Sequence, residues 1–188
     1  MKRFLTICSV MTMLVMATTA SAQQRYGWAV SGSPSNPCQI TGNFTPGGIA
    51  TLFLWLVYAN PSGMSAADLS VVVNPAGAVN VLAFNTANGY LNAGSATNLL
   101  LAVGGCPAGP VNAGSWLCLP VLPAWELCLG GNRLTVDCQI NPVAWDSDTH
   151  GFANGGAPTT CVNGMTDDCQ PIVSVENASW GNIKSLYR

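Results

Sequence analysis

Short apolar runs separated by turn-forming residues occupy most of the chain. The runs cover residues 50–59, 68–74, 78–84, 98–103, 115–122, 125–129, 133–140 and 171–177, and Gly, Pro and Asn gather between them. Runs of this length that are rich in branched and aromatic side chains predict β-strands, and their regular spacing predicts a sandwich or a barrel. We therefore expect a mainly β protein, an Ig-like antiparallel β-sandwich.

Local turn signals add detail to this expectation. The Pro-Ala-Gly sequence at 75–77 predicts a hairpin between the runs 68–74 and 78–84, and the Gly-Gly-Asn sequence at 130–132 predicts a turn between two further strands. Residues 141–170 are polar and rich in glycine. We interpret this stretch as a long loop region tied by a disulfide.

The first 22 residues have the three parts of a secretory signal peptide. Lys2 and Arg3 are followed by an uncharged apolar run at 4–17 and by the small residues Ala20-Ser21-Ala22. The run is shorter than the roughly 20 residues that span a bilayer. We therefore expect a signal peptide at 1–22 and a β-sandwich domain at 23–178. The expected location is outside the cytosol, whether periplasmic, cell-surface or extracellular, with no transmembrane segment after cleavage.

The C-terminal residues change from a strand pattern to a helix pattern. Trp180, Ile183, Lys184 and Tyr187 follow the i, i+3, i+4, i+7 spacing of one helix face. Ser179 can cap such a helix and Arg188 lies in its last turn, where the helix dipole favours a cation. The pattern predicts a short amphipathic tail over 179–188. A helix this short needs a surface to pack on, and both a docked element of the fold and a recognition or sorting element fit the pattern.

Charge is scarce and argues against one class of partner. Charged residues make up 7% of the chain and the formal net charge is −2. A chain with so few basic residues has little to attract a phosphate backbone, so we expect no nucleic-acid partner.

Cysteines are abundant after the expected cleavage point. They are Cys38, Cys106, Cys118, Cys128, Cys138, Cys161 and Cys169. In an exported chain they are disulfide candidates, and the absence of a C-x-x-C pair argues against zinc. The odd number leaves one thiol over. The spacing suggests Cys161 with Cys169 as a local pair, Cys118 or Cys128 with Cys138 across neighbouring strands, and Cys38 with Cys106 as a long-range pair.

One polar stretch carries candidate metal ligands. Asp146, Asp148 and His150 alternate before Gly151, which resembles the start of a calcium loop. His150 stands where an oxygen ligand belongs, and Ala157 stands where the loop needs its last carboxylate. We interpret the stretch as a solvated polar loop, with calcium as the alternative, and expect no other cofactor.

Catalytic signals are sparse. His150 is the single histidine and the chain has no G-x-S-x-G sequence, so a hydrolase ranks third among our hypotheses. Trp145 lies in a polar stretch and is the best candidate for stacking on a sugar. The preferred hypothesis is a secreted, non-enzymatic interaction or structural module of the cell envelope or exterior, which binds a protein or a glycan. A carbohydrate-binding module is the alternative.

The tail also carries a family resemblance. It is similar to the C-terminal Trp-Gly-x-x-Lys-x-Leu-Tyr-Arg signature of uncharacterised exported proteins from uncultured bacterial lineages. The matching residues are Trp180, Gly181, Lys184, Leu186, Tyr187 and Arg188. The resemblance implies a signal peptide and a cysteine-containing Ig-like or cohesin-like β-sandwich. That family has no assigned activity, so the resemblance implies export and fold but no mechanism.

Overall fold

The computed structural model describes residues 27–58, 63–107, 110–144, 150–157 and 161. Within this part of the chain the structure consists of strands, and no helix there is long and apolar enough to cross a membrane. The strands are β1 (Gly27–Ser31), β2 (Thr41–Gly42), β3 (Ala50–Tyr58), β4 (Met64–Asn74), β5 (Val79–Thr86), β6 (Leu91–Asn92), β7 (Asn98–Ala102), β8 (Val111–Pro120), β9 (Trp125–Asp137), β10 (Pro142–Ala144) and β11 (Phe152–Asn154). The predicted signal peptide, the strand candidate at 171–177 and the tail at 179–188 lie outside the described residues.

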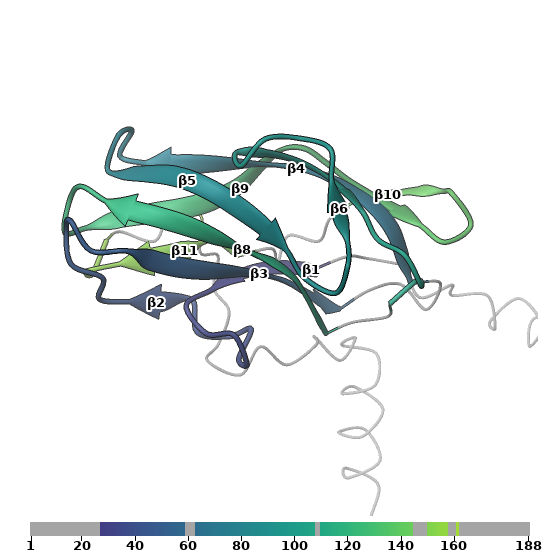
Figure 1. Ribbon diagram of the computed structural model, residues 1–188, viewed down its shortest axis with the longest axis horizontal. Coiled ribbons are helices and arrows are strands. Elements are labelled where there is room, and N and C mark those ends of the chain that lie inside the picture. Colours follow the sequence, from purple (N-terminus) through teal and green to yellow (C-terminus); the bar gives the residue numbers. More distant parts are fainter. Residues whose placement is uncertain (1–26, 59–62, 108–109, 145–149, 158–160, 162–188) are drawn as a thin grey trace, which may run out of the picture.

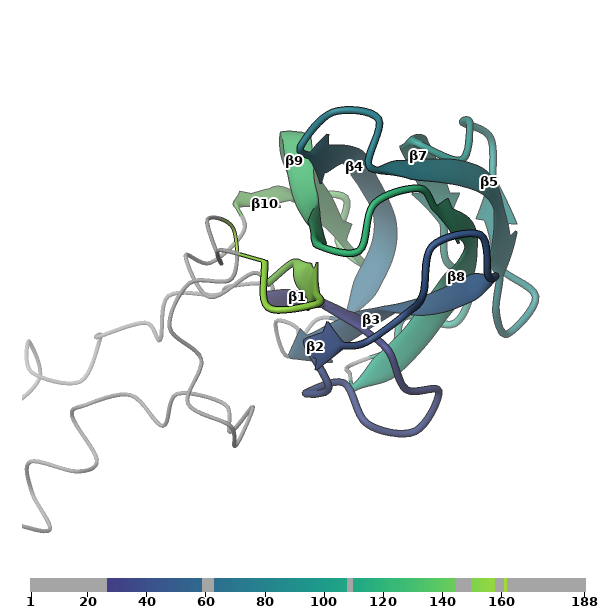
Figure 2. The ribbon, with the colours of Figure 1, turned by 90° about the vertical axis from the view of Figure 1, so that its left-hand side faces the viewer.

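The strands form two sheets that pack face to face (Figures 1 and 2). The smaller sheet has four strands in the order β1-β3-β8-β5. The larger has seven, in the order β2-β11-β9-β4-β7-β6 with β10 paired to β9. Neighbours are antiparallel throughout except for β11 and β2, which pair in parallel. The predicted antiparallel β-sandwich is confirmed.

Alternation of apolar and polar residues places the core between the sheets. In β7 the side chains of Leu99 and Leu101 are buried while their neighbours in the strand are exposed, as expected when successive side chains point to opposite faces. Trp28, Trp116 and Trp125 are fully buried. Burial of a large apolar side chain contributes about 1.5–3 kcal/mol, so this layer supplies much of the drive to fold.

Two of these three buried indoles keep hydrogen bonds inside the core, whereas Trp125 Nε1 is buried without a hydrogen-bond partner among the described residues. Trp116 Nε1 donates to the carbonyl oxygen of Ala96 at 2.8 Å, and Trp28 Nε1 donates to Thr135 Oγ1 at 3.3 Å. An indole N–H that is buried without an acceptor loses its hydrogen bond to water. These two contacts replace that bond, so Trp28 and Trp116 can be buried without this cost.

The predicted hairpin between 68–74 and 78–84 is wrong. The two strands form, but β4 pairs with β7 and β9 in the larger sheet, whereas β5 pairs with β8 in the smaller. The turn between them carries the chain from one sheet to the other, so the two strands lie on opposite sides of the core and do not pair with each other. A turn signal marks a reversal of direction, and a reversal serves both arrangements.

The predicted turn at 130–132 is also wrong, because β9 is one continuous strand. Its register with β4 passes from Ser70 opposite Gly130 to Asp68 opposite Leu134, so extra residues of β9 are accommodated in a bulge. Bulges take residues that otherwise favour turns, and they sharpen the local twist.

The stretch 141–170 is not a single loop region. It contains β10, which extends the larger sheet beside β9, and β11, which adds between β9 and β2. These strands have three residues each, too few for an alternating pattern to reveal them. Phe152 of β11 is fully buried in the core.

Candidate partner-binding face

The outer surface of the smaller sheet has no charge. None of the residues of β1, β3, β5 and β8 is Asp, Glu, Lys or Arg. The inward positions of these strands, such as Leu52, Leu54 and Cys118, are fully buried. The alternate positions therefore point outward, away from the core.

The outward side chains line up in rows across three strands. Thr51 of β3 stands opposite Leu117 of β8, which stands opposite Ala83 of β5. The next row joins Phe53, Ser115 and Asn85, and a third joins Leu119 and Asn80. We call this surface, together with Ile49 and Leu82, the four-strand face.

One leucine and one isoleucine side chain on this face are well exposed. Leu82 is 50% exposed and Ile49, immediately before β3, is 59% exposed. Leu82 has no partner in the register between Val81 and Ala83, so it is the extra residue of a bulge in β5. A bulge redirects a side chain, and here it adds an apolar group to the face.

The other end of the sheet is closed over. Ala29, Trp55 and Val57 form a buried cluster on the outer side of β1 and β3, and Phe53 packs against it. Trp55 Nε1 donates to the carbonyl oxygen of Ser33 at 3.3 Å, which ties the loop after β1 to the cluster. The open part of the face therefore lies over β3, β8 and β5.

The predicted disulfide pairs are wrong, although disulfides do form. Cys106 pairs with Cys138, and Cys128 pairs with Cys161, with Cα–Cα distances of 5.9 and 5.6 Å. Cys38 is disulfide-bonded, but its expected partner Cys106 pairs with Cys138 instead, and Cys169 lies outside the described residues. The local pair Cys161–Cys169 and the pairs of Cys138 with Cys118 or Cys128 are wrong, because each bridge joins segments 32 or 33 residues apart that the folded sheets bring together.

Cys118 is the free cysteine of the described chain, so it is not a disulfide residue. It lies on the inner side of β8 and is fully buried. Burial among apolar groups disfavours the thiolate and raises the pKa of Cys118 to about 12. The thiol behaves as a small apolar core group.

His150 is a core residue, so the solvated-loop interpretation is wrong at this position. Its side chain is fully buried. The backbone N–H of His150 donates to the carbonyl oxygen of Trp28 at 2.8 Å, and its carbonyl oxygen accepts from the backbone N–H of Val30 at 3.0 Å.

The other predicted site residues of this stretch are Asp146 and Asp148. They lie outside the described residues, so the calcium site stays a prediction. Trp145 and the tail residues Trp180, Ile183, Lys184, Tyr187 and Arg188 lie outside them too.

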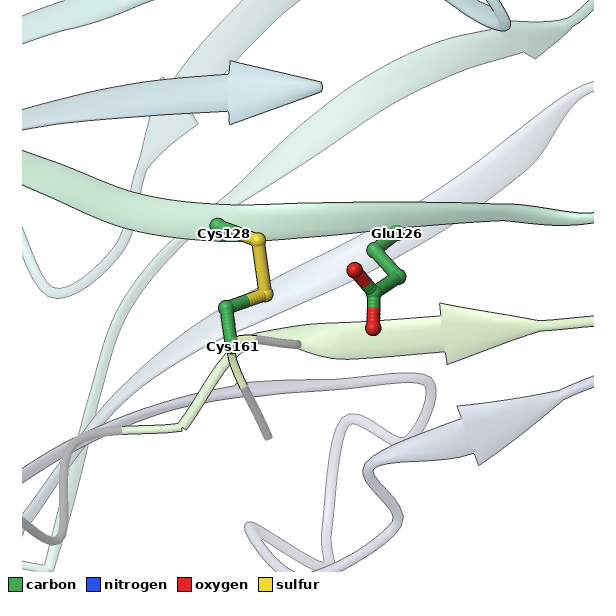
Figure 3. A group of neighbouring side chains, drawn as sticks. All are labelled: Glu126, Cys128 and Cys161. Atoms are coloured by element: carbon green, nitrogen blue, oxygen red, sulfur yellow. A yellow bond between two sulfur atoms is a disulfide. The ribbon is translucent and has the colours of Figure 1, made fainter. Parts of the chain in front are cut away.

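A second set of possible metal ligands lies on the outer side of β9. The ligand atoms of Glu126, Cys128 and Cys161 lie within 4.8 Å of one another (Figure 3). The two sulfur atoms are bonded to each other, so no thiolate is present to bind a metal. Gly151 packs against this disulfide, since a Cβ there would lie 2.7 Å from Cys161 Sγ. The group serves as a staple between β9 and the chain that follows β11.

A shallow pocket of about 550 Å³ lies where β2 meets β11. Its lining residues are Gln39, Thr41, Gly42, Asn43, Ala153, Gly156 and Ala157. None of these side chains titrates near neutral pH, so the pocket offers neither a general acid nor a general base.

No protein-family model matches the sequence, and no curated protein matches it. Solved structures match the fold. The chain is similar to the sixth cohesin of Acetivibrio cellulolyticus scaffoldin B, described in complex with a Cel5 dockerin mutant. The TM-score is 0.51 with 14% identity, over 69% of this chain and 96% of that one.

A second similar structure is a type I cohesin–dockerin complex with OlpA from Clostridium thermocellum. The TM-score is 0.52 with 7% identity, again over 69% of this chain and 96% of the other. At these identities the likeness concerns the fold. It confirms the cohesin-like β-sandwich that the resemblance of the tail implies.

Proposed function

We propose that this chain is a non-enzymatic interaction module that binds another exported protein on the four-strand face. The observation that carries the proposal is the make-up of that face, which combines outward Leu82, Leu117 and Leu119 with short uncharged polar groups. The core of a protein–protein interface is apolar and depleted in charge. The four-strand face has this composition across neighbouring strands of one sheet.

The composition distinguishes a protein partner from other partners. A phosphate backbone needs Lys or Arg, which these four strands lack. Trp28, Trp116 and Trp125 are fully buried and offer no ring for a sugar to stack on, whereas Trp145 lies outside the described residues. His150, the single histidine of the chain, lies inside the core, so it is not a base that a substrate could reach.

The fold supports the same proposal. The two similar cohesin structures are described in complex with a dockerin, which makes the sandwich a partner-binding module in those proteins. The disulfides of this chain suit an oxidising compartment, so we expect to find the partner outside the cytosol.

The proposal is tested with variants of single face residues. Leu117→Asp places a charge in the centre of the four-strand face, whereas Ile140→Asp places the same charge in the turn after β9, where Ile140 is 82% exposed. Immobilised mature protein is used to capture partners from the exported fraction of the organism that encodes it. Each captured protein is then purified, and its affinity for the three forms is measured by calorimetry.

We expect Leu117→Asp to weaken binding by at least tenfold, because a buried unpaired charge is costly at an interface. Ile140→Asp should leave the affinity within about threefold. Equal losses in both variants, or no loss in either, would exclude the four-strand face as the binding site. Binding of purified glycans in place of a protein, lost in Leu117→Asp, would replace this proposal with a carbohydrate-binding module.

A further inference from the structure

The outer side of the larger sheet carries a second apolar surface. Val72 of β4 is 54% exposed, Leu100 of β7 50%, Leu91 of β6 70% and Leu134 of β9 39%. Leu134 and Leu100 stand on either side of Asp68 in one row across β9, β4 and β7. We call Val72, Leu91, Leu100 and Leu134, with Asp68, the seven-strand face. Exposed apolar groups gathered across neighbouring strands mark a surface that something covers.

The described chain ends on this same side of the sheet. Leu127 and Leu129 of β9 are buried in the core, so Cys128 between them points outward. The disulfide holds Cys161 to Cys128, and Cys128 stands directly opposite Val72 in the register. Cys161, the last described residue, therefore lies beside the seven-strand face.

The remaining chain has the length and the pattern to cover that face. The 19 residues from Cys161 to Trp180 reach up to about 60 Å when extended, which exceeds any path across the sheet. A helix over 179–188 is about 15 Å long. Three strand spacings, from β9 to β6, also measure about 15 Å. Trp180, Ile183 and Tyr187 form the apolar side of that helix.

Charge agrees with the same arrangement. Lys184 lies on the apolar side of the predicted helix, and Arg188 follows one turn later. Asp68 gives the seven-strand face a negative charge, whereas the four strands of the smaller sheet carry no charged residue. We propose that the C-terminal segment 179–188 docks as an amphipathic helix on the seven-strand face of its own chain.

A crosslinking experiment on the full mature chain tests the docked position. A photoreactive benzoylphenylalanine replaces Ile183, and crosslinked peptides are mapped by mass spectrometry. We expect crosslinks within one chain to β4, β7 or β9. Crosslinks to β5 or β8, crosslinks only between two chains, or no crosslink at all would overturn the proposal. The second of these outcomes would indicate that a second copy covers the face.

A double-mutant cycle gives an independent test with a matched control. Leu100 and Leu82 are both 50% exposed, but they lie on opposite sheets. Trp180→Ala and Leu100→Ser should each lower Tm by about 2–4 °C, and the double variant should fall no further, because both changes remove the same contact. Leu82→Ser should be additive with Trp180→Ala. Additivity for Leu100→Ser would sink the proposal.

Discussion

Asp137 is a single residue that organises the end of β9 and the turn after it. Its carboxylate accepts hydrogen bonds from the backbone N–H groups of Asn141 and Gln139, at 2.8 and 2.9 Å, and from Asn141 Nδ2 at 3.2 Å. These bonds, with that from the Asn141 backbone foremost, lower the pKa of Asp137 against the opposing effect of burial. The turn also carries Cys138, so the carboxylate helps to position the disulfide to Cys106.

We predict a pH-dependent effect of Asp137→Asn. Because the pKa of Asp137 is lower in the folded chain, its contribution to stability is full above the unfolded pKa of about 3.9 and disappears as pH falls through the folded value. The variant should therefore melt below the wild type at pH 7, and the two Tm values should converge toward pH 2. Thermal melts across this range give the comparison. A constant gap at every pH would show that the carboxylate charge has no part in it.

The pairing of the cysteines could be predicted from the sequence only as far as their number determines it. The seven cysteines after residue 22 cannot all pair within one chain, and the free cysteine among the described residues is Cys118. Which cysteine it is depends on which side of β8 faces the core. The partners of Cys106 and Cys128 come from strands and loops that approach through the folded sheets, with separations of 32 and 33 residues, and spacing along the chain carries no such information.

At the scale of elements, β9 connects most parts of the larger sheet. It pairs with β4, β10 and β11 and holds Cys128 on its outer side. Gly151 lets the chain before β11 lie close to it, since a Cβ at this position would lie 2.5 Å from the carbonyl oxygen of Leu127. The Cys128–Cys161 disulfide therefore closes the segment that contains β10 and β11 against the strand on which both are built.

We predict that the double variant Cys128→Ala/Cys161→Ala loses about 2–4 kcal/mol of unfolding free energy, as expected for a closed loop of 33 residues. Hydrogen exchange should become faster first in β11, because its pairing with β9 then has no covalent support. Chemical denaturation and exchange mass spectrometry measure the two effects. Cys118→Ala serves as the control for loss of a cysteine without loss of a bridge. A loss spread evenly over both sheets would contradict this local role.

Strands with a long apolar run or clear alternation could be predicted, and short ones could not. The run at 50–59 gives β3 and the run at 98–103 gives β7. Strands β2, β10 and β11 have two or three residues and exist because longer neighbours offer them hydrogen bonds. The hairpin at 75–77 fails for a related reason, since the choice between pairing and crossing is made by the other strands of each sheet.

At the scale of the whole molecule, the stability of the fold is concentrated between the sheets. Leu52 of β3 is fully buried, whereas Leu117 of β8 points outward. We predict that Leu52→Ala costs about 2–5 kcal/mol of unfolding free energy, because it leaves a cavity in a packed core. Leu117→Ser should change stability by no more than about 0.5 kcal/mol. Chemical denaturation of both variants checks this, and similar losses would mean that the four-strand face is part of the core.

The general architecture follows from the sequence, but the proposed binding surface does not. Apolar alternation predicts two packed sheets, yet it says nothing of which strands share a sheet. Because of this, the absence of charge from β1, β3, β5 and β8 has no meaning until the topology brings these strands together. A charge-free sequence run is common, whereas a charge-free sheet surface is a specific property of the assembled molecule.

That charge-free surface also sets the kinetics of recognition. A face without charge adds little to the long-range attraction of a partner, so we expect association rate constants near the unsteered value of about 10⁵–10⁶ M⁻¹s⁻¹. The rate should change little between dilute buffer and concentrated salt, because the face itself has no charge to screen. Discrimination among partners then falls to the dissociation rate, which is set by how closely a partner fits Leu82, Leu117 and Leu119. Outside the cell, where ionic strength is not under the organism's control, such a module would keep its partner across changing salinity.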